Sequence, residues 1–181
     1  MRRETTSLRA AAVAAAAFAL GLTAAGIAQA AGDNDSNTKT CAQGEVYDSR
    51  SGKCVARQAG ALPDKDLAQY AYALAKAGRY GEAIEVLDLL KNPNTAVALN
   101  YRGYATRKMG KLDEGIGYYL KSVALDPHYA QVREYLGEAY VIKGDLAKAK
   151  EQLAVIKGIC GTGCEEYEDL EKAIAGKGNE G

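Results

Sequence analysis

The sequence predicts an all-α protein, a short α-solenoid of three helix-turn-helix units with a C-terminal capping helix and a small disulfide-stapled β-hairpin at the N-terminus. Three segments repeat one helical phrase, and their turn glycines, Gly78, Gly110 and Gly144, lie 32 and 34 residues apart. A period of this length is typical of stacked helical repeats. Each copy also carries two small residues twelve positions apart, where antiparallel helices must approach closely. These pairs are Ala71 and Ala83, Gly103 and Gly115, and Gly137 and Ala149.

The N-terminal segment 1–30 is expected to be a secretory signal peptide. It has a basic head with three arginines, an apolar stretch over 10–27, and the sequence Ala-Gln-Ala at 28–30, which has the form of a cleavage site. A retained membrane anchor is the alternative, because 18 apolar residues are nearly enough to span a bilayer. We expect cleavage, a periplasmic or secreted protein with no stable membrane insertion, and a flexible polar leader over 31–40.

The mature chain has a nearly balanced charge. Cleavage would remove three of the 23 basic residues and one of the 23 acidic residues, which leaves a formal charge of about minus two. Such a chain has no general attraction to nucleic acid or to anionic lipid, so nucleic-acid binding is not expected. The length that remains is enough for one domain with its own core.

The four cysteines are expected to form disulfides, because an exported chain meets an oxidising compartment. We expect two local bridges, since turn residues separate the members of each pair; a long-range bridge between the two ends is the alternative. The expected pairs are Cys41 with Cys54 and Cys160 with Cys164. A metal site is disfavoured, because the cysteines form no paired C-x2-C motif and His128 is the only histidine.

Residues 41–60 are expected to form the stapled hairpin. Its strands are placed around 45–47 and 53–56, with the polar turn 48–52 between them. A hairpin this small does not hold its shape unaided. The bridge from Cys41 to Cys54 would contribute about 3 kcal/mol by restricting the unfolded chain.

The helical units resemble tetratricopeptide repeats, whose pattern is W-x2-L-G-x2-Y, then A-x3-F, then P. The resemblance covers residues 64–160, in units 64–94, 95–128 and 129–160. The glycine slot of the first helix holds Ala71, Gly103 and Gly137, the alanine slot of the second helix holds Ala83, Gly115 and Ala149, and Pro127 closes the second copy. This resemblance implies that the first helix of each unit lines a concave groove.

Three positions depart from the repeat pattern. Arg102 occupies its leucine slot, Thr106 its tyrosine slot and Arg133 its tryptophan slot. We expect each arginine to lay its methylene stem on the core and to send its charged head to water. The packing interfaces of the second and third units are therefore expected to be less ideal than those of a unit that follows the pattern.

A capping helix is expected over 164–175. Tyr167, Leu170 and Ile174 share one face of this helix, and acidic residues at its start suit the helix dipole. A solenoid needs a last helix that is apolar inside and polar outside. Residues 176–181 are expected to be a tail.

The sequence offers little for catalysis. His128 lies where the first helix of the third unit begins, and we interpret it as a solvated first-turn residue. The chain contains no G-x-S-x-G elbow, no H-E-x-x-H pair and no G-x4-G-K-[ST] loop. We therefore expect neither enzymatic activity nor a cofactor.

A candidate groove for a partner follows from the residues of each first helix that do not face the second helix. They are Gln69, Tyr72, Lys76, Asn100, Tyr101, Tyr104, Arg107, Lys108, Glu134, Tyr135 and Glu138. The four tyrosines offer broad contact area at low entropy cost. Charge along the strip is basic in the first two units and acidic in the third, which suits a partner with an acidic end and a basic end. As an alternative, some tyrosines, Tyr101 and Tyr135 among them, pack between adjacent repeats.

The two-carboxylate clamp of the tetratricopeptide family is not expected here. It requires lysine and asparagine at two first-helix sites that hold Ala68 and Tyr72 in this chain. A partner would therefore be recognised by a different rule.

Three functions compete. The first is an exported, periplasmic adaptor or scaffold that holds a peptide or protein segment of the cell envelope in the tyrosine-lined groove. The second is a structural subunit of an envelope complex that docks through its convex face or its hairpin. The third, less favoured, is a thiol redox protein that uses Cys160 and Cys164.

Overall fold

The computed structural model describes residues 39–58, 60 and 62–178. A two-stranded sheet, β1 and β2, precedes seven helices. The elements are β1 (Glu45–Asp48), β2 (Lys53–Ala56), α1 (Asp64–Lys76), α2 (Tyr80–Leu87), α3 (Ala96–Lys108), α4 (Leu112–Leu125), α5 (Ala130–Lys143), α6 (Leu146–Cys160) and α7 (Glu165–Gly178). The predicted signal peptide, and all of the predicted leader except residues 39 and 40, lie outside the described residues. Among the helices that are described, none has the length and hydropathy needed to cross a membrane.

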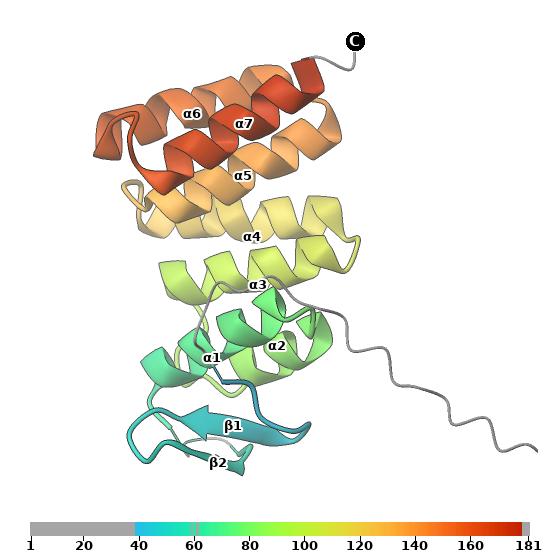
Figure 1. The fold of residues 1–181 in the computed structure, drawn as a ribbon, viewed down its shortest axis with the longest axis vertical. Coiled ribbons are helices and arrows are strands. Elements are labelled where there is room, and N and C mark those ends of the chain that lie inside the picture. Colours follow the sequence, from blue (N-terminus) through green and yellow to red (C-terminus); the bar gives the residue numbers. More distant parts are fainter. Residues whose placement is uncertain (1–38, 59, 61, 179–181) are drawn as a thin grey trace, which may run out of the picture. The chain divides into compact units, whose positions relative to one another are not determined.

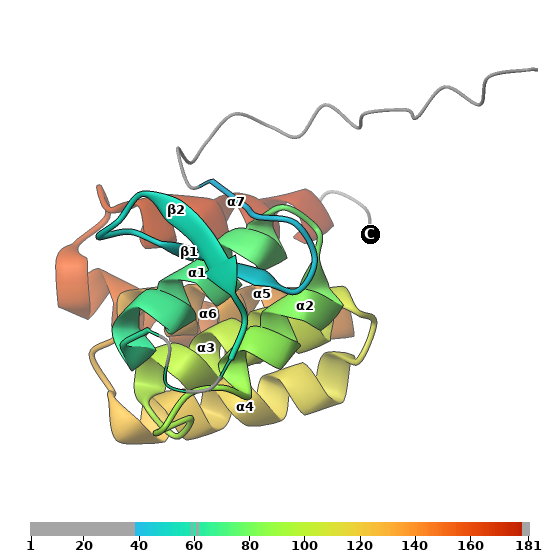
Figure 2. The same ribbon diagram turned by 90° about the horizontal axis from the view of Figure 1, so that it is seen from below.

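The helices form the predicted α-solenoid (Figure 1). α1 packs on α2, α3 on α4, and α5 on α6, and the three pairs stack in chain order. The first helices of successive units also contact one another, α1 with α3 and α3 with α5, and α7 continues this row by packing on α5 (Figures 1 and 2). One continuous core runs through the stack, from Val46 in β1 to Leu170 in α7.

The three turn glycines adopt the conformation that makes the units repeat. Gly78, Gly110 and Gly144 have φ of 77°, 85° and 83°, a left-handed backbone that residues with a Cβ rarely adopt. In each unit the residue after this glycine donates its backbone N–H to the carbonyl five residues earlier, as Arg79 does to Leu74 at 2.8 Å. This is the Schellman ending of a helix, and it turns the chain back into the second helix.

The small pairs serve close packing, but in two different ways. A Cβ on Gly103 would lie 2.7 Å from the ring of Tyr119 and 3.1 Å from the carbonyl oxygen of Gly115, so this pair brings α3 and α4 together. A Cβ on Gly137 would instead lie 2.7 Å from Cδ1 of Leu170. The small residue at position 137 therefore admits the capping helix, a role that the repeat pattern did not indicate.

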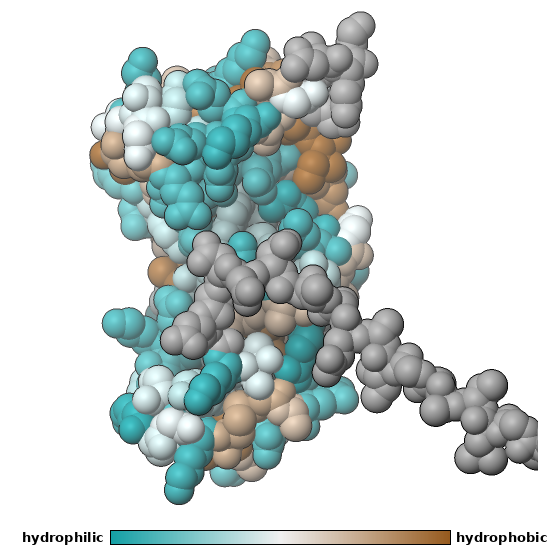
Figure 3. All heavy atoms as spheres, in the orientation of Figure 1, coloured by the Kyte–Doolittle hydropathy of each residue, from teal (hydrophilic) through white to brown (hydrophobic). Residues whose placement is uncertain are grey.

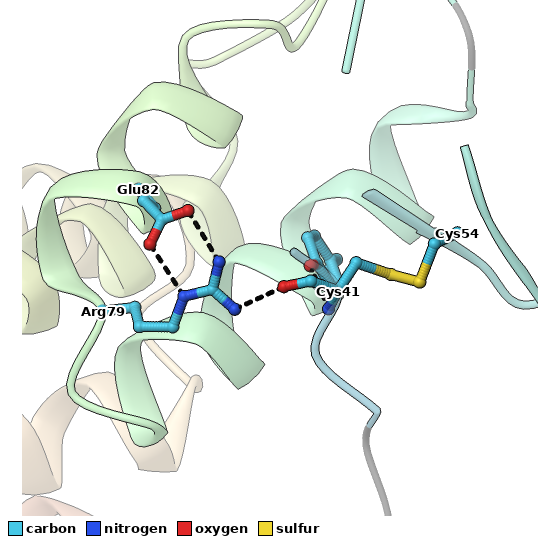
Figure 4. Close-up of a disulfide and its surroundings, with 5 residues drawn as sticks. Cys41, Cys54, Arg79 and Glu82 are labelled. Carbon is cyan, nitrogen blue, oxygen red and sulfur yellow. Dashed lines mark hydrogen bonds and ion pairs between the residues drawn. A yellow bond between two sulfur atoms is a disulfide. The ribbon is translucent and has the colours of Figure 1, made fainter. Parts of the chain in front are cut away.

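The hairpin is as predicted and forms the first layer of the stack. β1 pairs with β2 in an antiparallel register that places Val46 opposite Val55, and Cys41 is bridged to Cys54. Besides its apolar contacts, the hairpin is attached to the first unit by hydrogen bonds (Figure 4). Arg79 donates to the carbonyl oxygen of Cys41 at 2.6 Å and is also held by Glu82 through two 2.7 Å hydrogen bonds.

The two arginines that depart from the repeat pattern do not simply send their charged heads to water, as predicted; both heads bind polar groups of the protein. The guanidinium of Arg102 reaches outward to Asp88 at 2.6 Å. That of Arg133 donates to the carbonyl oxygen of Pro127 and to the side chain of Gln152. Thr106, which stands at the tyrosine slot of the pattern, is buried.

The capping helix is longer than predicted. Its core residue Leu170 is fully buried, and the predicted bridge from Cys160 to Cys164 joins the end of α6 to the start of α7. The helix continues through Gly178, so the prediction that the tail begins at residue 176 is wrong. This helix packs on α5 and α6, with Leu170 in the core and Tyr167 and Ile174 against it.

Candidate functional site

A cavity of about 240 Å³ opens between the row of first helices and the capping helix. Its lining comes from α1, α3, α5 and α7. The lining residues are Tyr72, Lys76, Tyr104, Lys108, Gln131, Glu134, Tyr135, Glu138, Glu165, Glu166 and Asp169. We call this cavity the groove; tyrosines form its floor, the two lysines its basic wall, and the five carboxylates its acidic wall.

The floor is one connected aromatic cluster. Tyr72 stacks on Tyr101 with ring centroids 4.4 Å apart, and Tyr104 lies 5.1 Å from Tyr135. The hydroxyls of Tyr72 and Tyr135 share a hydrogen bond of 2.7 Å, although the two residues are 63 positions apart. The superhelical stacking of the units thus brings the predicted tyrosine strip together.

These tyrosines are also part of the core. Tyr101, Tyr104 and Tyr135 are buried, whereas Tyr72 is partly exposed. Tyr101 does not line the groove, so the alternative that some tyrosines pack between repeats holds for it most fully. Burial raises the pKa of Tyr104 from its ordinary value of 10.0 to about 12.

Two other predicted groove residues lie beneath the floor. Asn100 is fully buried and donates to the hydroxyl of Tyr129 and to Gln131, each at 3.1 Å. Arg107 is buried as well, donating to the hydroxyl of Tyr119 at 3.2 Å and forming an ion pair with Glu138 at 2.7 Å. Both side chains fix the positions of groove residues and are not themselves open to a partner.

Gln69 lies outside the groove lining but touches its edge. Its side chain is exposed and donates to the hydroxyl of Tyr101 at 3.3 Å. The remaining predicted residues do line the groove. They are Tyr72, Lys76, Tyr104, Lys108, Glu134, Tyr135 and Glu138.

Glu134 is the most unusual side chain of the site. It is only 7% exposed, and no hydrogen bond or ion pair to it occurs within residues 39–58, 60 and 62–178. Burial is the largest cause that raises its pKa, to about 8, and the nearby charges of Glu138, Asp169, Glu166 and Glu165 add to the effect. A cleft carboxyl perturbed in this way is a marker of functional sites.

Part of the acidic wall was missed by the sequence reasoning. The sequence assigned the acidic residues at the start of the capping helix only to its dipole, and Asp169 to no role. α7 nevertheless takes the place of a first helix of a fourth unit, and its Glu165, Glu166 and Asp169 line the groove. The upper face in Figure 3, over α7 and α5, is accordingly mostly hydrophilic. The repeat pattern could have indicated this role, because a capping helix that packs on α5 continues the row of first helices, and those helices line the groove.

Among the described residues, two clusters bring three potential metal-ligand side chains within 4.8 Å of one another. Both are built on cysteine pairs, Cys41 with Cys54 and Cys160 with Cys164. In each pair the sulfurs are bonded to each other, so they are not thiolates that could hold a metal. Among the described residues the groove carboxylates form no such cluster with one another; Glu166 belongs to one only together with the disulfide-bonded Cys160 and Cys164.

Comparison with known proteins gives matches to solved structures. No protein-family model matches the chain, and no curated protein matches it by sequence. The structure of MamA matches with a TM-score of 0.53 and 24% identity over 64% of this chain and 68% of that one. The Yersinia enterocolitica type III secretion translocator chaperone SycD matches with a TM-score of 0.53 and 19% identity, over 65% of this chain and 89% of that one.

A third match is the first TPR domain of human RPAP3, with a TM-score of 0.52 and 21% identity over 65% of this chain and 97% of that one. At these identities the likeness concerns the fold. It confirms that the solenoid of this chain has the architecture of tetratricopeptide repeat domains.

Proposed function

We propose that this chain, which has the tetratricopeptide repeat fold, is an exported adaptor that holds a segment of another protein in the groove between α1, α3, α5 and α7. The observation that carries the proposal is the groove itself: an ordered tyrosine floor between walls of opposite charge. Tyrosine floors with charged rims are characteristic of protein interfaces. The groove is short, so it would hold a few residues of the partner.

Two of the similar solved structures contain peptides. SycD has been solved with a peptide of the translocator YopD, at a TM-score of 0.51, and the second TPR domain of human RPAP3 with an HSP70 peptide, at a TM-score of 0.50. The shared fold therefore supports peptide binding as the use of the solenoid. It does not carry over either peptide, because fold likeness names no ligand.

Export is supported by two independent features. The segment 1–30 has the order of a secretory signal, and all four cysteines of the chain are in disulfides, which persist mainly in oxidising compartments. We place the protein in the periplasm or outside the cell, and its partner in the cell envelope.

The hairpin is less suited to be a docking surface than the groove. Val46 of β1 is fully buried, and Cys41 is hydrogen-bonded through its backbone to the hydroxyl of Tyr70 and to Arg79. The apolar side of the hairpin is therefore already used in covering the first unit. We propose that the hairpin caps the solenoid, as α7 does at the other end.

Site-specific cross-linking tests the groove assignment. A photo-reactive benzoylphenylalanine is placed at Lys76 or Lys108, which are exposed on the basic wall, and at Leu120 of α4, which is 48% exposed on an outer helix, as a matched control. Irradiation of intact cells should give the same cross-linked partner from both groove positions.

The control decides between the groove and the convex face. A partner captured from position 120 but from neither groove position would show that the protein docks through its second helices, and the adaptor model would be wrong. Fractionation of the same cells reports on export, since a chain retained with its first 30 residues in the cytoplasm would contradict that part of the proposal.

A further inference from the structure

The acidic wall of the groove contains a carboxylate for which the described residues supply no counter-charge. Glu134 is buried on α5, yet it forms neither a hydrogen bond nor an ion pair with any described residue. Its neighbour one turn later, Glu138, is paired with Arg107 at 2.7 Å. Buried carboxylates are almost always paired, because removing the charge from water is costly. Glu134 therefore departs from the usual pairing of buried acids.

The carboxylate of Glu134 faces the groove. Glu134 is among the lining residues, and although its oxygens have no partner they are not enclosed by the protein, unlike the buried Oδ1 of Asn100. Lys76 and Lys108 line the same groove but form no ion pair with Glu134. A ligand that enters the groove can thus reach these oxygens.

We propose that the acidic wall binds a basic side chain, an arginine or a lysine of the partner segment, with Glu134 as its central acceptor and Glu166 and Asp169 of α7 beside it. This inference rests on the proposed function, because it names the residue type that the groove selects. The charge of the wall supports it: five carboxylates line the groove against two lysines. Complementary charge of this kind gives specificity to an interface.

The geometry favours a side chain over a metal ion. A metal ion requires oxygens that converge at about 2.0 to 2.6 Å, and no three of the acidic-wall carboxylates form a described group within 4.8 Å. Glu166 is in such a group only with Cys160 and Cys164, whose sulfurs are bonded to each other. A guanidinium has five N–H donors in a fixed fork, so it can satisfy carboxylates that lie apart.

The size and the floor of the groove also fit one side chain. Its volume of about 240 Å³ is below the range of roughly 300 to 1,000 Å³ that is common for drug-sized ligands. Tyr104 and Tyr135 contribute rings to the lining, and the face of a tyrosine ring attracts a cation. Cations of the protein itself already lie over both rings, Lys108 at 5.6 Å from the centre of Tyr104 and Arg107 at 6.0 Å from the centre of Tyr135, so these rings are placed where a cation is favoured.

Titratable and charged groups face Glu134 from every helix packed around the groove. They are Tyr72 and Lys76 of α1, Tyr104 and Lys108 of α3, Tyr135 and Glu138 of α5, and Glu165, Glu166 and Asp169 of α7. In the free protein, burial and the neighbouring carboxylates raise the pKa of Glu134 to about 8. A bound cation favours the ionised carboxylate and would lower this pKa again.

A set of matched peptides tests the inference. Four heptapeptides, Gly-Ser-Gly-Xaa-Gly-Ser-Gly with blocked ends, carry arginine, lysine, citrulline or glutamate at Xaa. Each is titrated into the ¹⁵N-labelled protein at about 0.15 M salt, where exposed charges are screened beyond about 8 Å. We expect the arginine or the lysine peptide to shift the backbone amides around Glu134 and Asp169, and the neutral citrulline peptide to bind at least tenfold more weakly.

Two variants complete the design. Glu134→Gln keeps the size of the side chain and removes its charge, so it folds and should bind the basic peptide at least tenfold more weakly. Glu151→Gln changes an exposed acid on α6, outside the groove, and should bind it as the unchanged protein does.

Three results would overturn the inference: equal binding of the citrulline peptide, equal binding by Glu134→Gln, or no shifts at 10 mM peptide. These outcomes are separate from a failure of the adaptor model. If the partner cross-links to position 76 with the same yield in the Glu134→Gln variant, the cation-site inference is wrong and the adaptor model stands. If the basic peptide binds but no cellular partner cross-links to a groove position, the adaptor model is wrong and the cation site stands.

Discussion

Replacing Glu134 with glutamine should stabilise the free protein at neutral pH. The carboxyl of Glu134 has a pKa of about 8 in the folded protein, against an ordinary value of 4.5. Between these two values the folded protein holds a proton at this site that the unfolded chain has released. The contribution of Glu134 to stability is therefore fully present below pH 4.5 and is lost progressively as the pH rises toward 8.

The size of the effect follows from the same two values. At pH 7 the protein is about 2.5 pH units above the ordinary pKa, and each unit corresponds to about 1.4 kcal/mol, so ionisable Glu134 costs about 3 kcal/mol relative to pH 4. Glutamine does not titrate and avoids this cost. With a urea slope of about 2 kcal/mol per molar, the gain at pH 7 would move the unfolding midpoint upward by about 1.5 M.

Urea unfolding of both proteins at pH 4, 5, 6, 7 and 8 provides the measurement, with the disulfides intact. The difference in unfolding free energy between Glu134→Gln and the unchanged protein should grow by about 1.4 kcal/mol per pH unit between pH 5 and 8. Glu151→Gln, at an exposed site, should follow the unchanged protein at every pH. A difference that stays constant from pH 4 to 8 would refute the reasoning, because Glu134 would then titrate as an exposed carboxyl does.

Two further predictions concern the ends of the solenoid. Gly137→Ala should lower the free energy of unfolding by about 1 to 3 kcal/mol, because its Cβ would lie 2.7 Å from Cδ1 of Leu170 in the cap. Gly117→Ala, whose Cβ would meet nothing within 4 Å, should instead stabilise by about 0.5 to 1 kcal/mol, and similar urea midpoints for the two variants would contradict the assigned packing of α7. Replacing both Cys41 and Cys54 with serine should cost about 3 kcal/mol, read as a lower midpoint in urea; an unchanged midpoint would show that the bridge does not support the hairpin.

Much of the fold could be predicted from local signals. The turn at position 110 could be predicted because glycine adopts a positive φ without strain, and Gly110 has a φ of 85° in the structure. The bridge from Cys41 to Cys54 follows from two cysteines on either side of a polar turn, since a hairpin brings such residues together. Signals of this kind depend on neighbours in the chain and need no knowledge of the stack.

The contents of the groove were predicted less completely. Helical periodicity placed Arg107 on the face turned away from the second helix of its unit, and this was wrong. Arg107 donates to Tyr119 of that helix, α4, and is also paired with Glu138 of the next unit, beneath the floor. The same reasoning assigned Glu165 and Asp169 to the cap and not to the groove wall that they form. Periodicity identifies the face of a helix; it does not identify what the next repeat places against that face.

The sequence by itself thus determined the three units, their left-handed turns, the two local disulfides and the tyrosine strip, because each depends on residues within one repeat period. Only the tertiary structure decided which of those tyrosines stay accessible, that Tyr72 and Tyr135 meet across 63 residues, and that Glu134 is buried without a partner. The physical reason is the superhelical stacking. Burial and electrostatic isolation depend on residues of other units, whose approach is set by how successive helix pairs pack.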